Sequence, residues 1–144
     1  MKDCLVMVRV LAFGTFDVIH PGHINYLEQA KSLGNELWVI IATDKNVEKI
    51  KGKKPTFSQE ERKKIIESLR VVDKAIIGFE EDLLKSVEKT KPDIIALGYD
   101  QKPNENELYQ ELEKRQIKAK IVRLKPYNQE NHKSTAIKEK IKKS

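Results

Sequence analysis

The stretch Gly14-Thr15-Phe16-Asp17-Val18-Ile19-His20-Pro21-Gly22-His23 lies between two segments of opposite periodicity. A continuous apolar run, Val6–Gly14, precedes it and is typical of a strand buried on both faces. Apolar residues at helical spacing follow it, at Ile24, Leu27 and Ala30. The stretch is therefore predicted to be a strand-to-helix turn.

Such a turn is suited to binding phosphate. Gly14 lets the backbone approach a ligand closely, and the backbone N–H groups at the following helix N-terminus attract anions. Pro21 and Gly22 shape the turn so that His20 and His23, three residues apart, can face the same space. Two imidazoles there could donate hydrogen bonds to phosphate oxygens as charge develops in a transition state.

Two other interpretations of the histidines stay open at this point. The pair could be zinc ligands, but only His132 and Cys4 remain as further soft ligands, and zinc usually takes three or four protein ligands. The histidines could also be ordinary turn residues. That interpretation is the weaker one, because two of the chain's three histidines fall in one glycine-containing turn.

The rest of the chain alternates between strands and helices. Such alternation predicts a single α/β domain over residues 1–144, with a doubly wound, five-stranded parallel sheet (Rossmann-like). Ser58-Gln-Glu-Glu61 has the form of a capping box, Gly34 stands where a C′ glycine ends a helix, and Pro92 blocks a helix near Lys91. The predicted strands are Val6–Gly14, Leu37–Thr43, Val71–Gly78, Ile94–Gly98 and Lys120–Leu124, and the last helix is Ser134–Lys143.

Composition narrows the possible classes of partner. Hydrophobic residues make up 39% and charged residues 35%, and Leu37–Ala42, the longest apolar stretch, is far shorter than the roughly 20 residues of a membrane helix. With no recognisable signal peptide and one cysteine, Cys4, we expect a cytoplasmic protein without membrane contact. The net charge of +6 favours anionic partners, but lysine and glutamate are interspersed, so we expect small anions and no nucleic acid.

The string GTFDVIHPGH resembles the GTFDxxHxGH motif of the cytidylyltransferase-like nucleotidyltransferases, and the resemblance extends from Arg9 to Ile141. This family, which includes glycerol-3-phosphate cytidylyltransferases and archaeal FAD synthetases, transfers a nucleoside monophosphate from an NTP to an acceptor phosphate and releases pyrophosphate. The resemblance implies that His20 and His23 contact the triphosphate and that Gly14, Thr15 and Phe16 surround the nucleotide. It also implies a divalent metal, most simply Mg²⁺, which Asp17 would help to hold, and a homodimer.

A lysine-rich loop, Lys51-Gly-Lys-Lys-Pro55, is a second candidate for phosphate binding, although by itself it could be a basic surface loop. The resemblance implies that Lys51 and Lys53 reach the phosphates and that Arg62 does so from the next helix. Arg70 and Asp73 match charged positions of the family, with a structural or a dimer-contact role equally open. The only tryptophan, Trp38, is expected to be a core residue of its strand.

The loops after the fourth and fifth strands suggest the substrate. Gly98-Tyr-Asp-Gln101 resembles the loop of archaeal FAD synthetases, so we expect ATP and FMN as substrates. Cytidylyl transfer to glycerol 3-phosphate and adenylyl transfer to a sugar phosphate are the alternatives within the family. A non-catalytic nucleotide-binding module is the alternative outside it. Residues expected to bind nucleotide here are Gly98, Asp100, Tyr127, Ser134 and Thr135, while the roles of His132 and Lys133 stay open.

Overall fold

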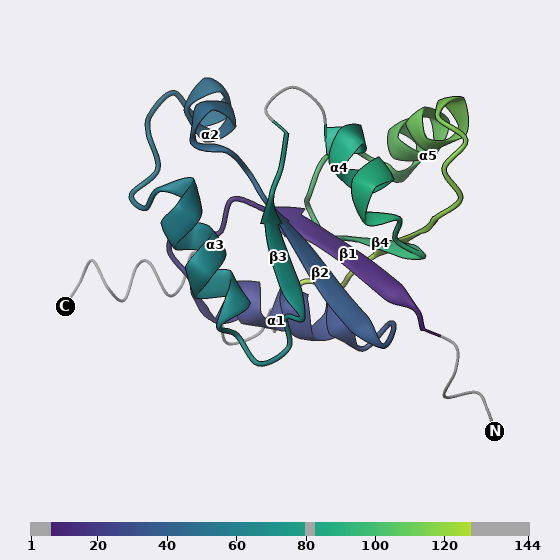
Figure 1. Cartoon of the computed structure of the whole chain (residues 1–144), viewed down its shortest axis with the longest axis horizontal. Helices are drawn as coiled ribbons and strands as arrows, with labels where there is room; N and C mark the ends of the chain where they lie inside the picture. Colours follow the sequence, from purple (N-terminus) through teal and green to yellow (C-terminus); the bar gives the residue numbers. More distant parts are fainter. Residues whose placement is uncertain (1–6, 80–82, 128–144) are drawn as a thin grey trace.

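The computed structural model describes residues 7–79 and 83–127 (Figure 1). Strands and helices alternate along this part of the chain, as predicted. The strands are β1 (Arg9–Gly14), β2 (Glu36–Ile41), β3 (Lys74–Ile77), β4 (Ile94–Leu97) and β5 (Lys120–Arg123). The helices are α1 (Pro21–Lys31), α2 (Asp44–Lys51), α3 (Gln59–Glu67), α4 (Leu83–Thr90) and α5 (Glu105–Lys114). The predicted last helix, Ser134–Lys143, and Cys4 lie outside the described residues.

The five strands form one parallel sheet in the order β3-β2-β1-β4-β5, which confirms the predicted doubly wound α/β class. β1 lies in the middle, and the chain moves outward through β2 and β3 before it returns to the other side of β1 at β4. The point at which the strand order reverses is where such sheets bind ligands, beyond the carboxyl ends of the strands. The predicted turn, Gly14–His23, begins at this end of β1.

Alternate residues of the central strands pack against different helices. Val10 and Ala12 of β1 belong to the cluster that includes residues of α1 and α3. Leu11 and Phe13 belong to the cluster that includes residues of α4 and α5. All four side chains are at most 8% exposed, so β1 is buried on both faces, as its continuous apolar run predicts. None of the helices in the described ranges is both long and apolar enough to cross a membrane.

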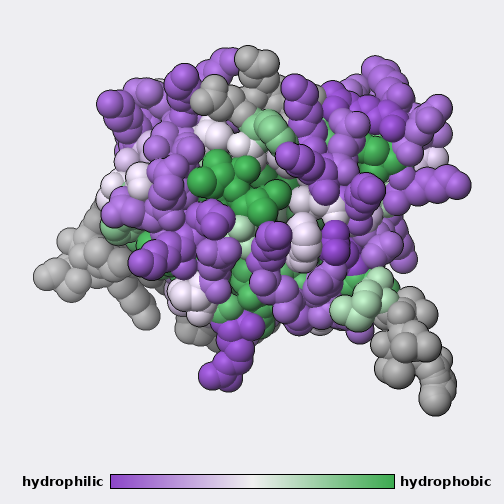
Figure 2. All heavy atoms as spheres, in the orientation of Figure 1, coloured by the Kyte–Doolittle hydropathy of each residue, from purple (hydrophilic) through white to green (hydrophobic). Residues whose placement is uncertain are grey.

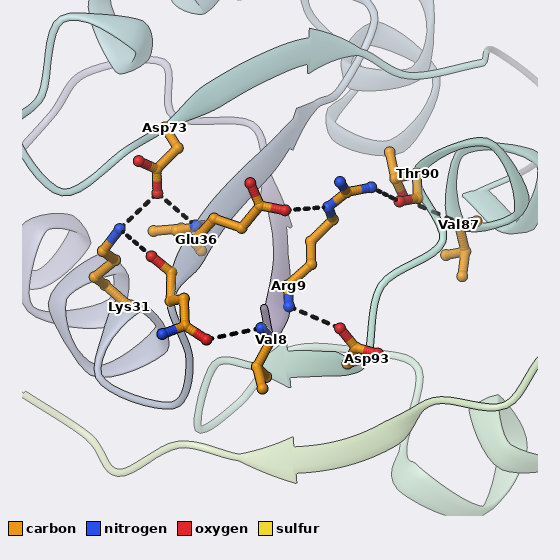
Figure 3. A network of polar contacts seen from close by, with 10 residues as sticks. Val8, Arg9, Lys31, Glu36, Asp73, Val87, Thr90 and Asp93 are labelled. Carbon is orange, nitrogen blue, oxygen red and sulfur yellow. Dashed lines mark hydrogen bonds and ion pairs between the residues drawn. The ribbon is translucent and has the colours of Figure 1, made fainter. Parts of the chain in front are cut away.

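At the amino end of the sheet, an Asn or Asp directly before β2, β3 and β4 joins the chain to a neighbouring strand or to the residue before that strand. The side chain of Asp73 accepts a hydrogen bond from the Leu37 backbone N–H at 2.7 Å, and the Asp73 N–H donates to the Leu37 carbonyl at 2.9 Å. Asp93 makes the same pair of hydrogen bonds with the backbone of Arg9, one of which Figure 3 shows, and Asn35 makes it with the backbone of Val8. Asp73 thus has a structural role, one of the two that the sequence left open.

The same end of the sheet carries a network of ion pairs (Figure 3). The Arg9 guanidinium lies 2.6 Å from Glu36, donates to the Thr90 carbonyl, and stands 3.8 Å from the centre of the Trp38 ring. The Lys74 ammonium is 4.8 Å from the same ring. Trp38, which was expected to be a core residue, packs against the core of β1, α4 and α5 but is only partly buried, with these two cations over its ring.

Two glycines follow helices, and only one of them acts as a left-handed cap. Gly52 ends α2 with φ 79°, a conformation that glycine adopts without strain. The prediction that Gly34 is a C′ glycine was wrong, because α1 ends at Lys31 with Ser32 as its C-cap, and Gly34 has no positive φ. The cause at Gly34 is close packing: a Cβ there would lie 2.6 Å from the Val8 carbonyl oxygen. The capping box at Ser58 and Glu61 is confirmed.

We expect Asp73→Ala to lower the free energy of unfolding by about 1–3 kcal/mol at pH 7, because the buried Leu37 N–H loses its side-chain acceptor. Asp73→Asn keeps an acceptor and loses the ion pair with Lys31, so we expect it to cost only about 0.5–1 kcal/mol. Urea denaturation of both variants measures the difference.

The pH dependence of the Asp73→Asn effect follows from the pKa of this carboxyl. Desolvation raises that pKa, but the hydrogen bonds from Lys31 and Leu37 outweigh it and hold the pKa below the ordinary 3.8. A carboxyl group whose pKa is lower in the folded state stabilises that state at pH values above its unfolded pKa. This stabilisation is lost as the pH falls through the folded pKa. The difference in the free energy of unfolding between wild type and Asp73→Asn should therefore shrink as the pH falls below about 3.8. A gap that is the same at pH 7 and pH 3 would contradict this assignment.

Candidate active site at the first strand-to-helix turn

The two histidines form the cap of α1. His20 is the N-cap residue in extended conformation, and its Nδ1 accepts a hydrogen bond from the Gly22 backbone N–H at 3.0 Å. His23 is the N3 residue, and its Nδ1 accepts from the His20 backbone N–H at 3.2 Å. This is the reciprocal pattern of a capping box, with imidazoles in the places usually held by Ser or Thr and by Glu. Pro21 occupies the first helical position, where no backbone N–H is needed.

The cap determines which ring nitrogen carries the proton. A neutral imidazole has one donor and one acceptor nitrogen, and Nδ1 is the acceptor in both His20 and His23. The proton of each neutral ring is therefore on Nε2, the nitrogen farther from the backbone. Each ring can offer an N–H donor without giving up its contact with the helix terminus.

Close packing holds the rings in place. The two imidazole centroids are 3.9 Å apart with a tilt of 32°, and the buried Phe16 ring meets His23 edge-on at 5.6 Å. A Cβ on Gly22 would lie 2.8 Å from Cε1 of His20, and a Cβ on Gly14 would lie 3.0 Å from the Phe16 ring. Both glycines are thus required by the side chains that lie over them.

Phe16 also has an unusual backbone. Its φ is 51°, in the left-handed region that a non-glycine residue adopts at a cost of about 1 kcal/mol or more. Its ring is 3% exposed and stacks on Tyr26 of α1 at 6.4 Å, which holds the residue in this conformation. The turn after β1 is therefore shaped by a buried ring as well as by its glycine.

The electrostatic surroundings keep His23 neutral. Burial, followed by the electrostatic effects of the neighbouring His20 and Lys51, lowers the pKa of His23 from 6.5 to about 4. At neutral pH His23 is an uncharged donor through Nε2. A bound polyphosphate would act in the opposite direction, because a nearby negative charge raises the pKa of an imidazole. Lys51, an exposed residue, exerts this effect from the end of α2, so the predicted lysine loop lies beside the turn.

Asp17 ties the turn to the segment that follows the lysine loop. Its Oδ2 accepts from the Thr56 N–H at 2.7 Å and its Oδ1 from the Phe57 N–H at 2.9 Å. Desolvation raises the pKa of this carboxyl, but the two hydrogen bonds outweigh it and hold the pKa below the ordinary value. Asp17 thereby fixes the end of the loop that carries Lys51 and Lys53.

Arg62 lies on α3, after the Ser58 cap, as the sequence predicted, and its guanidinium is enclosed by protein. Its side chain is 0% exposed, and it donates to the Thr15 carbonyl at 2.9 Å, the Phe57 carbonyl at 3.0 Å and the Asp44 carboxylate at 2.7 Å. In this arrangement the guanidinium positions the backbone of the turn and is enclosed by protein. Direct contact between Arg62 and phosphate stays a prediction, and it would require the side chain to leave these acceptors.

The loop after β4 is joined to β1 by side-chain hydrogen bonds. Gln101 donates from Nε2 to the Phe13 carbonyl at 2.6 Å and accepts at Oε1 from the Gly98 N–H at 3.0 Å. The hydroxyl of Tyr26 donates to the Ala96 carbonyl at 2.8 Å and accepts from the Phe13 N–H at 3.3 Å. These contacts align the carboxyl ends of β1 and β4, on either side of the point where the strand order reverses.

Arg123, at the end of β5, supports the same loop. Its Nη1 donates to the carbonyl oxygens of Gly98 and Gln101, both at 2.7 Å, while Glu105 lies 2.6 Å from its Nη2. The exposed residue Asp100 therefore lies in a loop that these hydrogen bonds hold in place. Tyr127 is part-exposed, two residues after Lys125, whose backbone exchanges two hydrogen bonds with the Gln29 side chain.

The structure brings together most of the site residues that the sequence predicted. Gly14 to Asp17, the two histidines and the lysine loop meet at the carboxyl end of β1, with the Gly98–Gln101 loop held against the same strand. Ser134, Thr135, His132 and Lys133 lie outside the described residues. Sequence reasoning missed Tyr26 and the side-chain role of Gln101. The signal for Tyr26 was its position among the apolar residues of α1, because a tyrosine hydroxyl that is buried there usually has a hydrogen-bond partner.

A metal ion would find few protein ligands here. Within residues 7–79 and 83–127, no three His, Cys, Asp or Glu side chains gather in a way that could hold one. Each oxygen of Asp17 already accepts one backbone hydrogen bond and keeps a second lone pair, so contact between Asp17 and a metal ion stays a prediction. Mg²⁺ needs few such ligands, because it is commonly held by substrate phosphates and water.

Comparison with known proteins gives concordant results. The model of the cytidylyltransferase-like family matches residues 11–140. The chain is 53% identical over 119 residues to the FAD synthase of Ferroglobus placidus, covering 83% of this chain and 77% of that protein. It is 46% identical over 135 residues to the FAD synthase of Thermoplasma volcanium, covering 94% of both. A solved structure from T. volcanium, described as a lipopolysaccharide core biosynthesis protein, superimposes with a TM-score of 0.82 at 48% identity and covers 85% of this chain and 100% of that one.

The electrostatic description of the turn can be checked by NMR titration of the histidines. We expect His23 to titrate at about pH 4 and to show a protonated Nε2 at pH 7. Lys51→Gln removes a positive charge that lowers this pKa, so the midpoint should rise. Lys53→Gln is the matched control and should leave it unchanged, because Lys53 is not among the causes of the shift. A wild-type midpoint near 6.5 would contradict the burial and charge assigned to this ring.

Proposed function

The chain belongs to the cytidylyltransferase-like family, and on that premise we propose that it is an FAD synthase that transfers the adenylyl group of ATP to FMN. The observation that carries the proposal is the pair of imidazoles that cap α1 through Nδ1 and can offer two Nε2–H donors beside a helix N-terminus. This is an arrangement of donors for a polyphosphate. The choice of ATP and FMN rests on the relatives named FAD synthase, which are 44–53% identical to this chain.

The reaction is an in-line displacement at phosphorus. An oxygen of the FMN phosphate attacks the α-phosphorus of ATP, and a new P–O bond forms as the bond between the α-phosphorus and the bridging α–β oxygen breaks. Pyrophosphate leaves with the electron pair of that bond, and FAD is the other product. No covalent enzyme intermediate is required, so the protein acts by positioning the substrates and stabilising charge.

His20 and His23 are proposed to donate Nε2–H hydrogen bonds to the triphosphate. Charge on its oxygens shifts as the transition state forms, so these contacts would strengthen during the reaction and act mainly on turnover. Their rings are held before the substrate arrives, because the helix cap and Phe16 already restrain them. Preorganised donors of this kind avoid the cost of reorientation during the reaction.

The remaining predicted residues have supporting roles in the proposal. Lys51 and Lys53 attract the phosphates and the departing pyrophosphate. Asp17 holds the end of the lysine loop in place, and Arg62 holds the backbone of the turn. The backbone from Gly14 to Phe16 would lie along the nucleotide. Gly98, Asp100 and Tyr127, with Ser134 and Thr135 from outside the described residues, would complete the nucleotide site.

Three further parts of the proposal concern the setting of the enzyme. We propose that Mg²⁺ arrives with the triphosphate, where it would neutralise phosphate charge, and no step above depends on a protein cage for it. We also propose a homodimer and a cytoplasmic location, as expected from the sequence. Sedimentation of the purified protein tests the oligomeric state.

The direct test is to incubate the purified protein with ATP, FMN and Mg²⁺ and to follow FAD and pyrophosphate by chromatography. Matched reactions contain CTP in place of ATP, and glycerol 3-phosphate or a sugar phosphate in place of FMN. We expect FAD only in the first reaction. Consumption of another acceptor without FAD formation would overturn the FAD synthase assignment while leaving the nucleotidyltransferase class intact.

Histidine variants that preserve the cap separate catalysis from folding. Asparagine can place an acceptor near the position of Nδ1, and it is among the preferred N-cap residues, but it lacks the distal N–H. We therefore expect His20→Asn and His23→Asn to remain folded and to lose about 10²–10³-fold in kcat, the scale of one preorganised donor. ATP affinity should fall much less. Variants whose ATP affinity collapses while kcat is retained would refute the role of these rings in the transition state.

A further inference from the structure

A small pocket lies beside the turn, on the side of β2 and β3. Its volume is about 140 Å³, and its walls include the side chains of Phe13, Ile40, Phe79 and Leu83. It is reached between the carboxyl ends of the strands and the starts of α2 and α4, from which Asn46 and Ser86 contribute. Figure 2 shows hydrophobic surface in this region, beside the carboxyl end of β3 and between the charged surfaces over α2 and α4.

The lining indicates what kind of group the pocket can take. No charged side chain is among the described residues that line it. Two of its polar groups are already engaged: the Thr43 hydroxyl accepts from the Asn46 N–H at 3.1 Å, and the Ser86 hydroxyl accepts from the Phe79 N–H at 3.4 Å. An anion would lose its hydration without meeting a cation in this lining. A neutral group that is mainly apolar fits this lining best.

The position of the pocket relates it to the second substrate. Gly14 and Thr15, which begin the turn with the histidines, are also part of its wall. The loop that is expected to hold the nucleotide, Gly98–Gln101, lies on the opposite side of β1, after β4. A molecule with its apolar end in the pocket would therefore extend its other end over the turn, facing a nucleotide bound on the β4 side.

We propose that the pocket receives the dimethylbenzene end of the isoalloxazine ring of FMN, an inference that rests on the proposed function. A pocket of about 140 Å³ is smaller than the clefts of roughly 300 Å³ and more that enclose whole drug-sized ligands, so it takes one end of the ring system. The dimethylbenzene end is the apolar end of that ring. The ribityl phosphate then projects toward Thr15 and the imidazoles, where its oxygen can attack the α-phosphorus.

Phe79 is the residue that can test this inference without disturbing the core. It is 41% exposed, and its ring is also contacted by the Lys89 ammonium, 5.6 Å from the ring centre. An exposed aromatic ring at the edge of an apolar pocket can stack on a flat ligand. Its loss should weaken ring binding and leave the phosphate contacts intact.

The experiment measures binding of riboflavin, which has the ring and lacks the phosphate, by quenching of flavin fluorescence. We expect Phe79→Ala to raise the Kd for riboflavin and the KM for FMN about fivefold to tenfold, with the KM for ATP unchanged. Phe79→Tyr keeps the ring and should bind nearly as wild type. Tyr109→Ala is the matched control, since Tyr109 is 55% exposed on α5 and does not line the pocket.

The outcomes separate this inference from the proposed function. If FAD is formed and Phe79→Ala behaves like Tyr109→Ala in riboflavin binding and in the KM for FMN, the pocket is not the ring site, although the enzyme is an FAD synthase. If no FAD is formed but riboflavin binds in a Phe79-dependent way, the ring site stands and the reaction is wrong. Competition by glycerol 3-phosphate against riboflavin would also overturn the inference, because it would indicate a polar ligand in the pocket. Circular dichroism checks that each variant is folded.

Discussion

The structure of the site depends on one reciprocal contact, in which the two imidazoles cap the first turn of α1 through Nδ1. This contact satisfies backbone N–H groups that a helix otherwise leaves without partners at its start. It also assigns the ring proton to Nε2 and fixes the rings side by side. One pair of side chains therefore ends the turn after β1 through Nδ1 and can supply hydrogen-bond donors through Nε2, so only a substitution that keeps the Nδ1 acceptor separates the two roles.

The surrounding fold keeps this cap aligned with the rest of the sheet. At the amino ends of the strands, hydrogen bonds such as those between Asp73 and Leu37 join neighbouring segments. At the carboxyl ends, hydrogen bonds of the Tyr26 and Gln101 side chains hold β1 against β4 and the loop that follows it. Asp17 and Arg62 join the turn to the start of α3. The functional end of the sheet is thus braced from both sides of β1. An uncharged pocket lies toward β2 and β3, and a polar loop lies toward β4, an arrangement that the proposed reaction between FMN and ATP could use.

Much of this could be predicted from the sequence, because the signals are local. Continuous apolar runs identify strands that are buried on both faces, and the Gly14–His23 stretch identifies the strand-to-helix turn after β1. The rest depends on contacts between distant segments. Arg62 looks like a phosphate ligand in sequence, yet its acceptors come from three separate segments and enclose it. Gly34 follows a helix, but it must be glycine because the carbonyl of Val8, directly before β1, lies too close for a side chain. Such partners cannot be identified from spacing alone.

The most direct measurement is a crystal structure of the protein soaked with a non-hydrolysable ATP analogue. The cap predicts triphosphate oxygens at about 2.7–3.2 Å from Nε2 of both His20 and His23, with Nδ1 of each ring still bound to the backbone N–H groups of α1. An analogue bound elsewhere, or rings that leave the cap and turn Nδ1 toward the phosphates, would contradict the account of how this turn works.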